Sequence, residues 1–186
     1  MRILCIGGNC EGHDTIKILD QQLGTHYRIY GPVDNLSFHS FRDVDTLLSG
    51  KFFDRMDKYE RVCYDGYPTY EWDNIRMIHN DWELPKVKAE MARRIENFRE
   101  AVGKPDVWYM YAPAAYDEYV SEYEINKIYD KYPYLRGRTF CVVSGRYKIP
   151  PCFEKMFIIF KAAPWDEDPV GIAKRWKEAG YEQPVL

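Results

Sequence analysis

Two uninterrupted apolar runs are the feature that most constrains the fold of this chain. They span residues 106–112 and 155–161, with charged residues only at their ends, and neither alternates between apolar and polar side chains. Strands without alternation are buried on both faces, as in a parallel sheet that helices cover on each side. Similar runs predict further strands at residues 2–6, 27–31, 61–64, 74–79 and 138–144.

Segments with helical periodicity separate these strands. The clearest spans residues 85–102, where apolar side chains recur every three or four positions between Pro85 and Gly103. Further helices are predicted at residues 11–23, 42–54, 114–131 and 169–179. Because strands alternate with helices, we expect one α/β domain over residues 1–186, a three-layer sandwich with a mostly parallel central sheet.

The composition argues against several classes of function. A net charge of −3 without a basic tract disfavours nucleic-acid binding, and no apolar run reaches the roughly 18 residues of a membrane span. The five cysteines include no CxxC pair, and no export signal precedes the first strand. We therefore expect reduced thiols in the cytoplasm, or in the host cytoplasm if the protein is viral. No metal-ligand spacing and no GxGxxG loop occurs, so no metal or cofactor is expected.

Cys10 is the strongest candidate for a chemical role. It follows the strand at residues 2–6 and the pair Gly7-Gly8, and it precedes the helix at residues 11–23. Ligands of parallel sheets bind beyond the carboxyl ends of the strands, which is where this turn lies. The partial positive charge of a helix start also favours thiolate over thiol. These features predict a nucleophile, although cysteine at such a turn is often only a small packing residue.

The residues around Cys10 suggest an oxyanion and substrate site. The amide of Asn9 and the backbone N–H groups of Cys10 and Glu11 are expected to face a developing oxyanion, next to Gly8. Asn9 has an alternative role, which is to cap the following helix.

A nucleophilic cysteine needs a base and a group that orients the base. His79 ends the strand at residues 74–78, and Asp81 lies two positions later on the same face of an extended segment, where it can fix the imidazole tautomer. His13 is nearer in sequence, but its side chain is expected to point along the helix. The alternative for His79 is a structural histidine at a strand end.

The other cysteines are expected to be unreactive. Cys5, Cys63 and Cys141 lie within predicted strands and are expected in the core, whereas Cys152 follows a Pro-Pro pair in a loop without a nearby base.

Four short motifs resemble a family of bacterial and viral proteins of uncharacterised function that are described as papain-like cysteine peptidases. Residues 4–11 (LCIGGNCE) are similar to its opening LGxNCE. Residues 31–36 (GPVDNL) resemble its PFDW motif, residues 79–82 (HNDW) its HDF motif, and residues 93–98 (RRIENF) its RRIxRF helix. The resemblance covers about residues 3–112.

This resemblance implies that Cys10 is the nucleophile, that His79 is the base, and that Asp34 or Asp81 is the third member. Asn35 and Arg94, which lie within the same motifs, are expected at the substrate site. The strand–turn–Cys–helix order fits a three-layer hydrolase such as SGNH-type esterases better than papain. It is also similar to a capsular-polysaccharide enzyme family that has a GNC motif and binds coenzyme A.

Three functions remain open at this point. The first is a cysteine-dependent hydrolase or acyl transferase that acts on a small-molecule or peptide substrate. The second is a protein that sequesters a nucleotide-like ligand, for instance during phage infection, with a phosphate bound by Arg93, Arg94 or Arg146. The third is an interaction protein that packs the tyrosines of residues 116–132 against a partner or against a second copy of itself, as a homo-oligomer.

Overall fold

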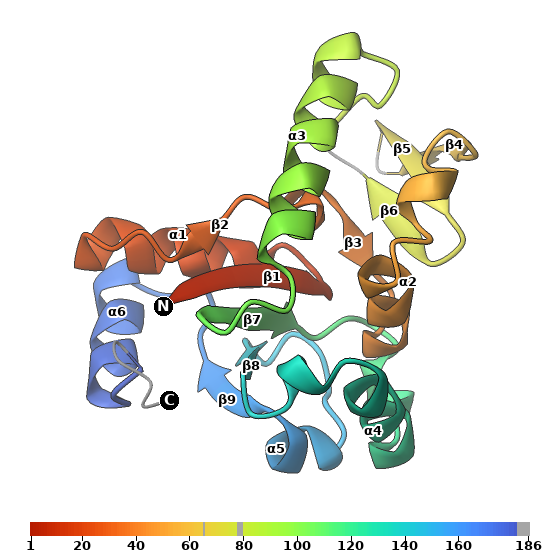
Figure 1. Cartoon of the computed structure of the whole chain (residues 1–186). Coiled ribbons are helices and arrows are strands. Elements are labelled where there is room, and N and C mark those ends of the chain that lie inside the picture. Colours follow the sequence, from red (N-terminus) through yellow and green to blue (C-terminus); the bar gives the residue numbers. More distant parts are fainter. Residues whose placement is uncertain (65, 78–79, 182–186) are drawn as a thin grey trace.

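The structure of the chain is a computed structural model that describes residues 1–64, 66–77 and 80–181, without the side chains of Asn35 and Tyr64. Within these residues, parallel strands form a five-stranded sheet in the order β2-β1-β7-β8-β9 (Figure 1). The strands are β1 (Arg2–Gly8), β2 (Arg28–Ile29), β7 (Val107–Ala112), β8 (Thr139–Val143) and β9 (Ile158–Lys161). Every residue of β7 is buried, as its unalternating sequence predicts. The predicted three-layer α/β sandwich is confirmed.

Helices cover both faces of this sheet. The helices are α1 (Glu11–Leu23), α2 (Val44–Leu48), α3 (Pro85–Ala101), α4 (Glu122–Lys131), α5 (Cys152–Met156) and α6 (Pro169–Glu178). Short 3₁₀ turns are η1 (Pro32–Asn35), η2 (Phe41–Asp43), η3 (Phe53–Arg55), η4 (Asp117–Tyr119) and η5 (Pro133–Leu135).

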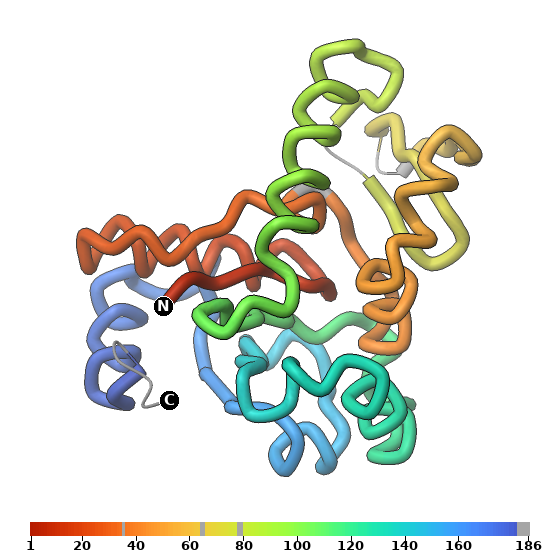
Figure 2. Tube along the Cα trace, in the orientation of Figure 1, coloured from red at the N-terminus to blue at the C-terminus, as the bar shows by residue number. Residues whose placement is uncertain are grey.

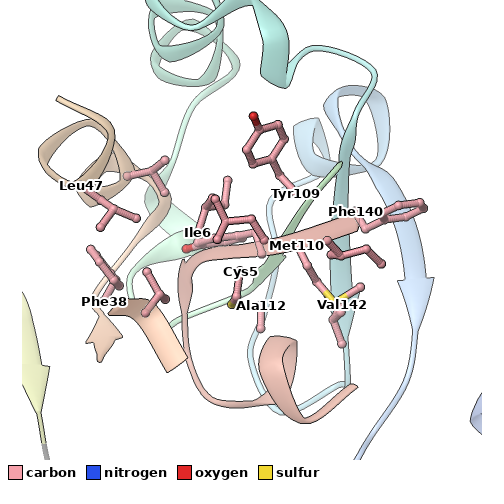
Figure 3. Packing of buried hydrophobic residues seen from close by; sticks show 14 of the residues in the cluster. Cys5, Ile6, Phe38, Leu47, Tyr109, Met110, Ala112, Phe140 and Val142 are labelled. Carbon is pink, nitrogen blue, oxygen red and sulfur yellow. The ribbon is translucent and has the colours of Figure 1, made fainter. Parts of the chain in front are cut away.

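The two faces of the sheet have different partners. Cys5, Ala112 and Val142 point toward the side of α1, whereas Ile6 and Tyr109 point to the opposite side (Figure 3). The α1 face also carries α6, which packs beside α1. On the opposite face, the ring of Phe157, just after α5, stacks on Tyr111 of β7 with a centroid distance of 6.4 Å. These contacts place the main core on both sides of β1 and β7.

A second sheet lies beside the first. It is antiparallel, in the order β3-β6-β5-β4, with β3 (Ser37–Phe38), β4 (Glu60–Tyr64), β5 (Tyr67–Trp72) and β6 (Ile75–Met77). The chain runs from β1 and β2 into this sheet and returns through α3 to β7 (Figure 2). The strands predicted at residues 61–64 and 74–79 therefore belong to a second sheet, and β5 was not predicted because Pro68 and Glu71 interrupt its apolar pattern.

Three predicted boundaries were wrong. Residues 155–156 end α5, so β9 begins only at Ile158. Residues 42–54 form separate short helices, broken where Gly50 takes a φ of 75°. The helix predicted from residue 114 begins at Glu122, because Ser121 and Glu124 form a capping box at its start.

No helix within residues 1–64, 66–77 and 80–181 combines the length and apolar character that crossing a bilayer requires.

Candidate functional site

Cys10 lies where the sequence predicts it, between the end of β1 and the start of α1. Its side chain is half-buried. Its backbone is already helical, with φ −64° and ψ −16°, and its carbonyl accepts the N–H of Asp14 at 2.9 Å. The thiol therefore belongs to the first turn of α1, at the carboxyl edge of the parallel sheet, where ligands of such sheets bind.

The glycines before Cys10 allow β1 to press against β7. The register between the two strands shifts between Cys5 and Gly7, and Gly8 has a φ of 84°. A Cβ atom on Gly8 would lie 1.4 Å from the carbonyl oxygen of Ala112. Gly8 is therefore a backbone contact with β7, and it shapes the turn that carries Cys10.

Asn9 holds this turn through hydrogen bonds inside the protein. Its Oδ1 accepts the N–H of Glu11 at 2.7 Å, which is the helix-capping role left open by the sequence. Its Nδ2 donates to the carbonyl of Pro113 at 2.8 Å and to Glu11 Oε2 at 3.3 Å. Because both the Glu11 N–H and the Asn9 amide already have partners, neither is placed here as a free oxyanion donor.

Glu11 is a buried carboxylate beside the thiol, and it does not face open solvent as a substrate contact would. Ser144 donates its hydroxyl to Glu11 Oε2 at 3.0 Å, and Arg146 Nε lies 3.2 Å from Oε1. Burial raises the pKa of Glu11, and the hydrogen bonds from Ser144 and Asn9 and the charge of Arg146 oppose this.

Loops after β8 and β9 complete this edge. Arg146 lies over the ring of Trp165 at 4.6 Å, and Trp165 Nε1 donates to Asp14 at 2.7 Å. Ser144 and Trp165, which contact Glu11 and Asp14 of α1, were not predicted at this edge from the sequence. Their position after the ends of two parallel strands was the available signal.

An open hollow lies at the same edge, next to Ser144. Its volume is about 480 Å³, and its lining includes Gly145, Ala163 and Arg175. Ser144 also donates to Glu11, but neither Glu11 nor Cys10 is among the residues that line the hollow.

The electrostatic surroundings of Cys10 do not favour a thiolate. Burial is the largest cause that raises the pKa of the Cys10 thiol above its ordinary value of 9.0, and the carboxylates of Asp14, Glu11 and Asp34 raise it further. A hydrogen bond from the backbone N–H of Cys10 lowers this pKa, as a helix start is expected to do, but burial and the carboxylates outweigh it. The thiol is protonated at neutral pH, so nucleophilic chemistry here requires a base.

Asp34 is the centre of a buried charge cluster near Cys10. Its Oδ2 accepts hydrogen bonds from Arg94 Nη1 at 2.9 Å and from Arg28 Nη2 at 3.2 Å. Burial raises the pKa of Asp34, and the charges of Arg28, His13 and Arg94 oppose the increase. The negative charge of Asp34 raises the pKa of the Cys10 thiol and that of the His13 imidazole.

His13 belongs to this cluster, although the sequence analysis gave it no role. Its side chain is 20 % exposed, and its Nε2 lies 3.5 Å from Asp14 Oδ1. Its Nδ1 is buried and has no hydrogen-bond partner. Burial lowers the pKa of His13, and Asp34 is the strongest of the charges that oppose this.

The predicted base, His79, lies outside the described residues, so its distance from Cys10 stays a prediction. Asp81 lies against the antiparallel sheet. Its Oδ1 accepts hydrogen bonds from the hydroxyl of Tyr70 and from the N–H of Glu83, and these lower the pKa of Asp81. Its pairing with His79 is a prediction as well.

Two of the remaining predicted substrate contacts, both arginines, bind carboxylates of the protein itself, and the third lies outside the described residues. Arg94 binds Asp34 and also Glu90, with Nε 2.8 Å from Oε1. Arg93 binds the same Glu90. The side chain of Asn35, in η1, is outside the described part of the chain.

The four other thiols test the predictions made for them. Cys5 and Cys141 are buried, as expected, but Cys63 is exposed, because β4 is an edge strand of the second sheet. Cys152 is half-buried, and its thiol donates to the carbonyl of Val120 at 3.5 Å.

Among the described residues, no group of three or more His, Cys, Asp or Glu side chains could hold a metal ion. Comparison of the chain with known protein families, with curated proteins and with solved structures finds no match.

Proposed function

We propose that this protein is a cysteine-dependent hydrolase or acyl transferase in which Cys10 is the nucleophile. The observation that carries the proposal is the position of Cys10: a half-buried thiol in the first turn of α1, at the carboxyl edge of the parallel sheet. The hollow beside Ser144 lies at the same edge of the sheet, although Cys10 does not line it.

The reaction begins with a protonated thiol, because the pKa of Cys10 is raised. A base removes the proton of Sγ, and the sulfur attacks a substrate carbonyl carbon. The leaving group then departs with a proton from the protonated base, which produces a thioester on Cys10. Water, in a hydrolase, or a second nucleophile, in a transferase, attacks the thioester, and the returning proton restores the thiol.

The oxyanion needs donors other than those expected from the sequence. The first N–H groups of a helix have no acceptors within the helix. Asn9 occupies that of Glu11, so in this proposal the oxyanion accepts hydrogen bonds from the following N–H groups of the first turn of α1.

Acyl transfer from p-nitrophenyl acetate and from a series of short acyl thioesters tests this proposal. Intact-mass analysis should show one acetyl group on the protein, and peptide mapping should place it on Cys10. Cys10→Ala should remove the adduct. Cys152→Ala is the matched control, because Cys152 is also half-buried but lies away from the sheet edge, and this variant should acylate normally. Acylation of Cys10 no faster than that of Cys152 would refute the proposal.

Sequestration of a nucleotide-like ligand has less support. Arg93 and Arg94 pair with Glu90, and Arg146 pairs with Glu11, so the guanidinium groups expected to bind a phosphate already face carboxylates. Tyr116, Tyr119 and Tyr123 are exposed, but nothing in the described residues indicates what would cover them.

A further inference from the structure

The hydroxyl of Ser144 is held in one orientation by two hydrogen bonds. Ser144 is the first residue after β8, and it lines the hollow at the carboxyl edge of the sheet. Its Oγ donates to Glu11 Oε2 at 3.0 Å and accepts the N–H of Arg146 at 3.2 Å. A hydroxyl oxygen has one proton and two lone pairs. Because the proton faces a carboxylate and one lone pair is occupied, the other lone pair is left for an atom of a ligand.

Glu11 is positioned to receive the proton of this hydroxyl. Its side chain is 2 % exposed, and its Oε1 lies 3.2 Å from Arg146 Nε. Its Oε2 also accepts a hydrogen bond from Asn9 Nδ2 at 3.3 Å. These two contacts orient the carboxylate from the turn before α1 and from the loop after β8. A hydroxyl within hydrogen-bond reach of a base that further groups orient is the arrangement of activated nucleophiles.

A second serine–glutamate pair in the chain shows what is different about this one. Ser121 Oγ donates to Glu124 Oε2 at 2.8 Å, at the start of α4. There the hydrogen bond from Arg42 lowers the pKa of Glu124 to about 2, which makes that carboxylate a weak base. Burial instead raises the pKa of Glu11 above its ordinary value of 4.5, which makes Glu11 the stronger base of the two.

The hollow supplies space and positive charge next to the hydroxyl. Its volume is about 480 Å³, within the range of small-molecule sites, and small side chains such as that of Ala163 line it beside Ser144. Arg175 lines it as well and is held in place, because Nη2 lies 2.7 Å from Glu167 Oε2 and Nε donates to the carbonyl of Lys161 at 3.3 Å. A fixed guanidinium suits the negative charge that develops on the carbonyl oxygen of an ester under attack.

We propose that Ser144 is a second nucleophile of this protein, with Glu11 as its general base, and that the pair hydrolyses small acyl esters bound in the hollow. This activity goes beyond the proposed function, and it does not need Cys10.

The reaction consumes one ester and one water. Ser144 Oγ attacks the carbonyl carbon while its proton moves to Glu11 Oε2. The bond from that carbon to the alcohol oxygen breaks, and the alcohol leaves with the proton from Glu11. Water then attacks the ester on Ser144 and gives a proton to Glu11, and the carboxylic acid departs as this proton returns to Oγ. Because Glu11 activates the water, the ester on Ser144 does not accumulate.

Labelling with a fluorophosphonate probe tests the nucleophile. The oxygen of an activated serine displaces fluoride from phosphorus, and water removes the resulting adduct only slowly. Peptide mapping should place the probe on Ser144, and Ser144→Ala should remove it. Ser121→Ala is the matched control, because Ser121 also donates to a glutamate but belongs to the cap of α4, and it should be labelled at the rate of the unsubstituted protein. No label, or label on another serine, would overturn the proposal.

The labelling rate of substituted carboxylates tests the base. Glu11→Gln should lower the rate at pH 7 by about 100-fold, the lower end of the usual effect of general base catalysis. Glu124→Gln, in the second serine–glutamate pair, should leave the rate unchanged. An unchanged rate in Glu11→Gln would overturn the role of Glu11.

The pH profile between pH 4 and pH 8 tests the same role without a change at Glu11. The rate should fall at acid pH, where Glu11 becomes protonated. Arg146→Gln should move this inflection to higher pH, and Asp166→Asn should move it to lower pH, because the charge of Arg146 lowers the pKa of Glu11 and that of Asp166 raises it. An inflection that neither substitution moves would show that Glu11 is not the base.

The two nucleophiles separate this inference from the proposed function. The fluorophosphonate label on Ser144 should persist in Cys10→Ala, and acetylation of Cys10 by p-nitrophenyl acetate should persist in Ser144→Ala. Loss of the label in Cys10→Ala would overturn the inference, because the label would then depend on the thiol. Labelled Ser144 without acetylation of Cys10 would refute only the proposed function.

Discussion

At the scale of single residues, three buried carboxylates depend on hydrogen bonds from other parts of the protein. Glu11, Asp34 and Asp117 are all buried, and each accepts hydrogen bonds from groups distant in the sequence. Because an unpaired buried polar atom costs free energy, these carboxylates require their partners. Substitutions at such positions should therefore have large and specific effects.

Asp117 offers the clearest test of stability. It is 0 % exposed; Oδ1 accepts the N–H of Phe41, and Oδ2 accepts both the N–H of Ala114 and the hydroxyl of Tyr111. Asp117→Asn replaces an acceptor by an NH₂ group that faces donors. We expect the free energy of unfolding in urea to fall by about 2–4 kcal/mol. Asp130→Asn, at an exposed position, should change it by less than about 0.5 kcal/mol. Equal effects of the two substitutions would contradict this explanation.

The pH dependence of Cys10 alkylation is the second test at this scale. Only the thiolate reacts with iodoacetamide, and burial raises the pKa of Cys10 above 9.0. The thiolate fraction therefore increases throughout the range from pH 7 to pH 9, so the rate should rise about tenfold per pH unit without a plateau. The rate is followed by peptide mass spectrometry at each pH. A plateau near pH 7 would show a stabilised thiolate and contradict the raised pKa.

At the scale of elements, the contact between β1 and β7 determines the geometry of the turn. The register shift in β1 and the close approach of Gly8 to Ala112 direct the chain into α1. The glycine pair is a local signal, so the sequence predicts a turn there. The strand that Gly8 touches is about a hundred residues away, and no local pattern identifies it.

Gly8→Ala tests this contact. The new Cβ atom would overlap the carbonyl oxygen of Ala112. Because this oxygen belongs to the backbone of the paired strand β7, it cannot move aside as a flexible side chain could. We expect the free energy of unfolding to fall by about 4 kcal/mol or more, at the exceptional end of single substitutions. Gly50→Ala is the matched control: Gly50 also has a positive φ, of 75°, but nothing lies within 4 Å of its added Cβ atom. It should lose only about 1–2 kcal/mol, measured in the same urea titration.

At the scale of the whole molecule, a long excursion separates the strands that form the centre of the sheet. Between β2 and β7 the chain builds the antiparallel sheet and α3 before it returns to pair with β1 (Figure 2). The α6 helix, near the other end of the chain, then covers the α1 face through Trp176. Stability therefore depends on contacts between both ends of the chain.

Trp176→Ala tests that dependence. Trp176 is fully buried, and its ring lies 4.9 Å from that of Phe140 and 5.1 Å from that of Phe160. Loss of a buried tryptophan should cost about 3–5 kcal/mol, seen as a lower urea midpoint with an unchanged slope. Val170→Ala, at an exposed position of the same helix, should change stability by less than about 0.5 kcal/mol. A similar midpoint for both variants would show that α6 contributes little to the core.

The sequence by itself determined the layered α/β fold, the strand–glycine–Cys10–helix turn and the burial of Cys5 and Cys141, because each depends on apolar periodicity or on glycine within a short stretch of chain. Only the tertiary structure decided that the Cys10 thiol is half-buried and that the carboxylate of Asp34, held by Arg28 and Arg94, acts on it. Arg28, Asp34 and Arg94 come from three separate elements, and their contacts depend on how those elements pack. Burial, which raises the pKa of Cys10 the most, and the contribution of Asp34 exist only in the folded protein, whereas Asp14 and Glu11 lie within the same helical turn.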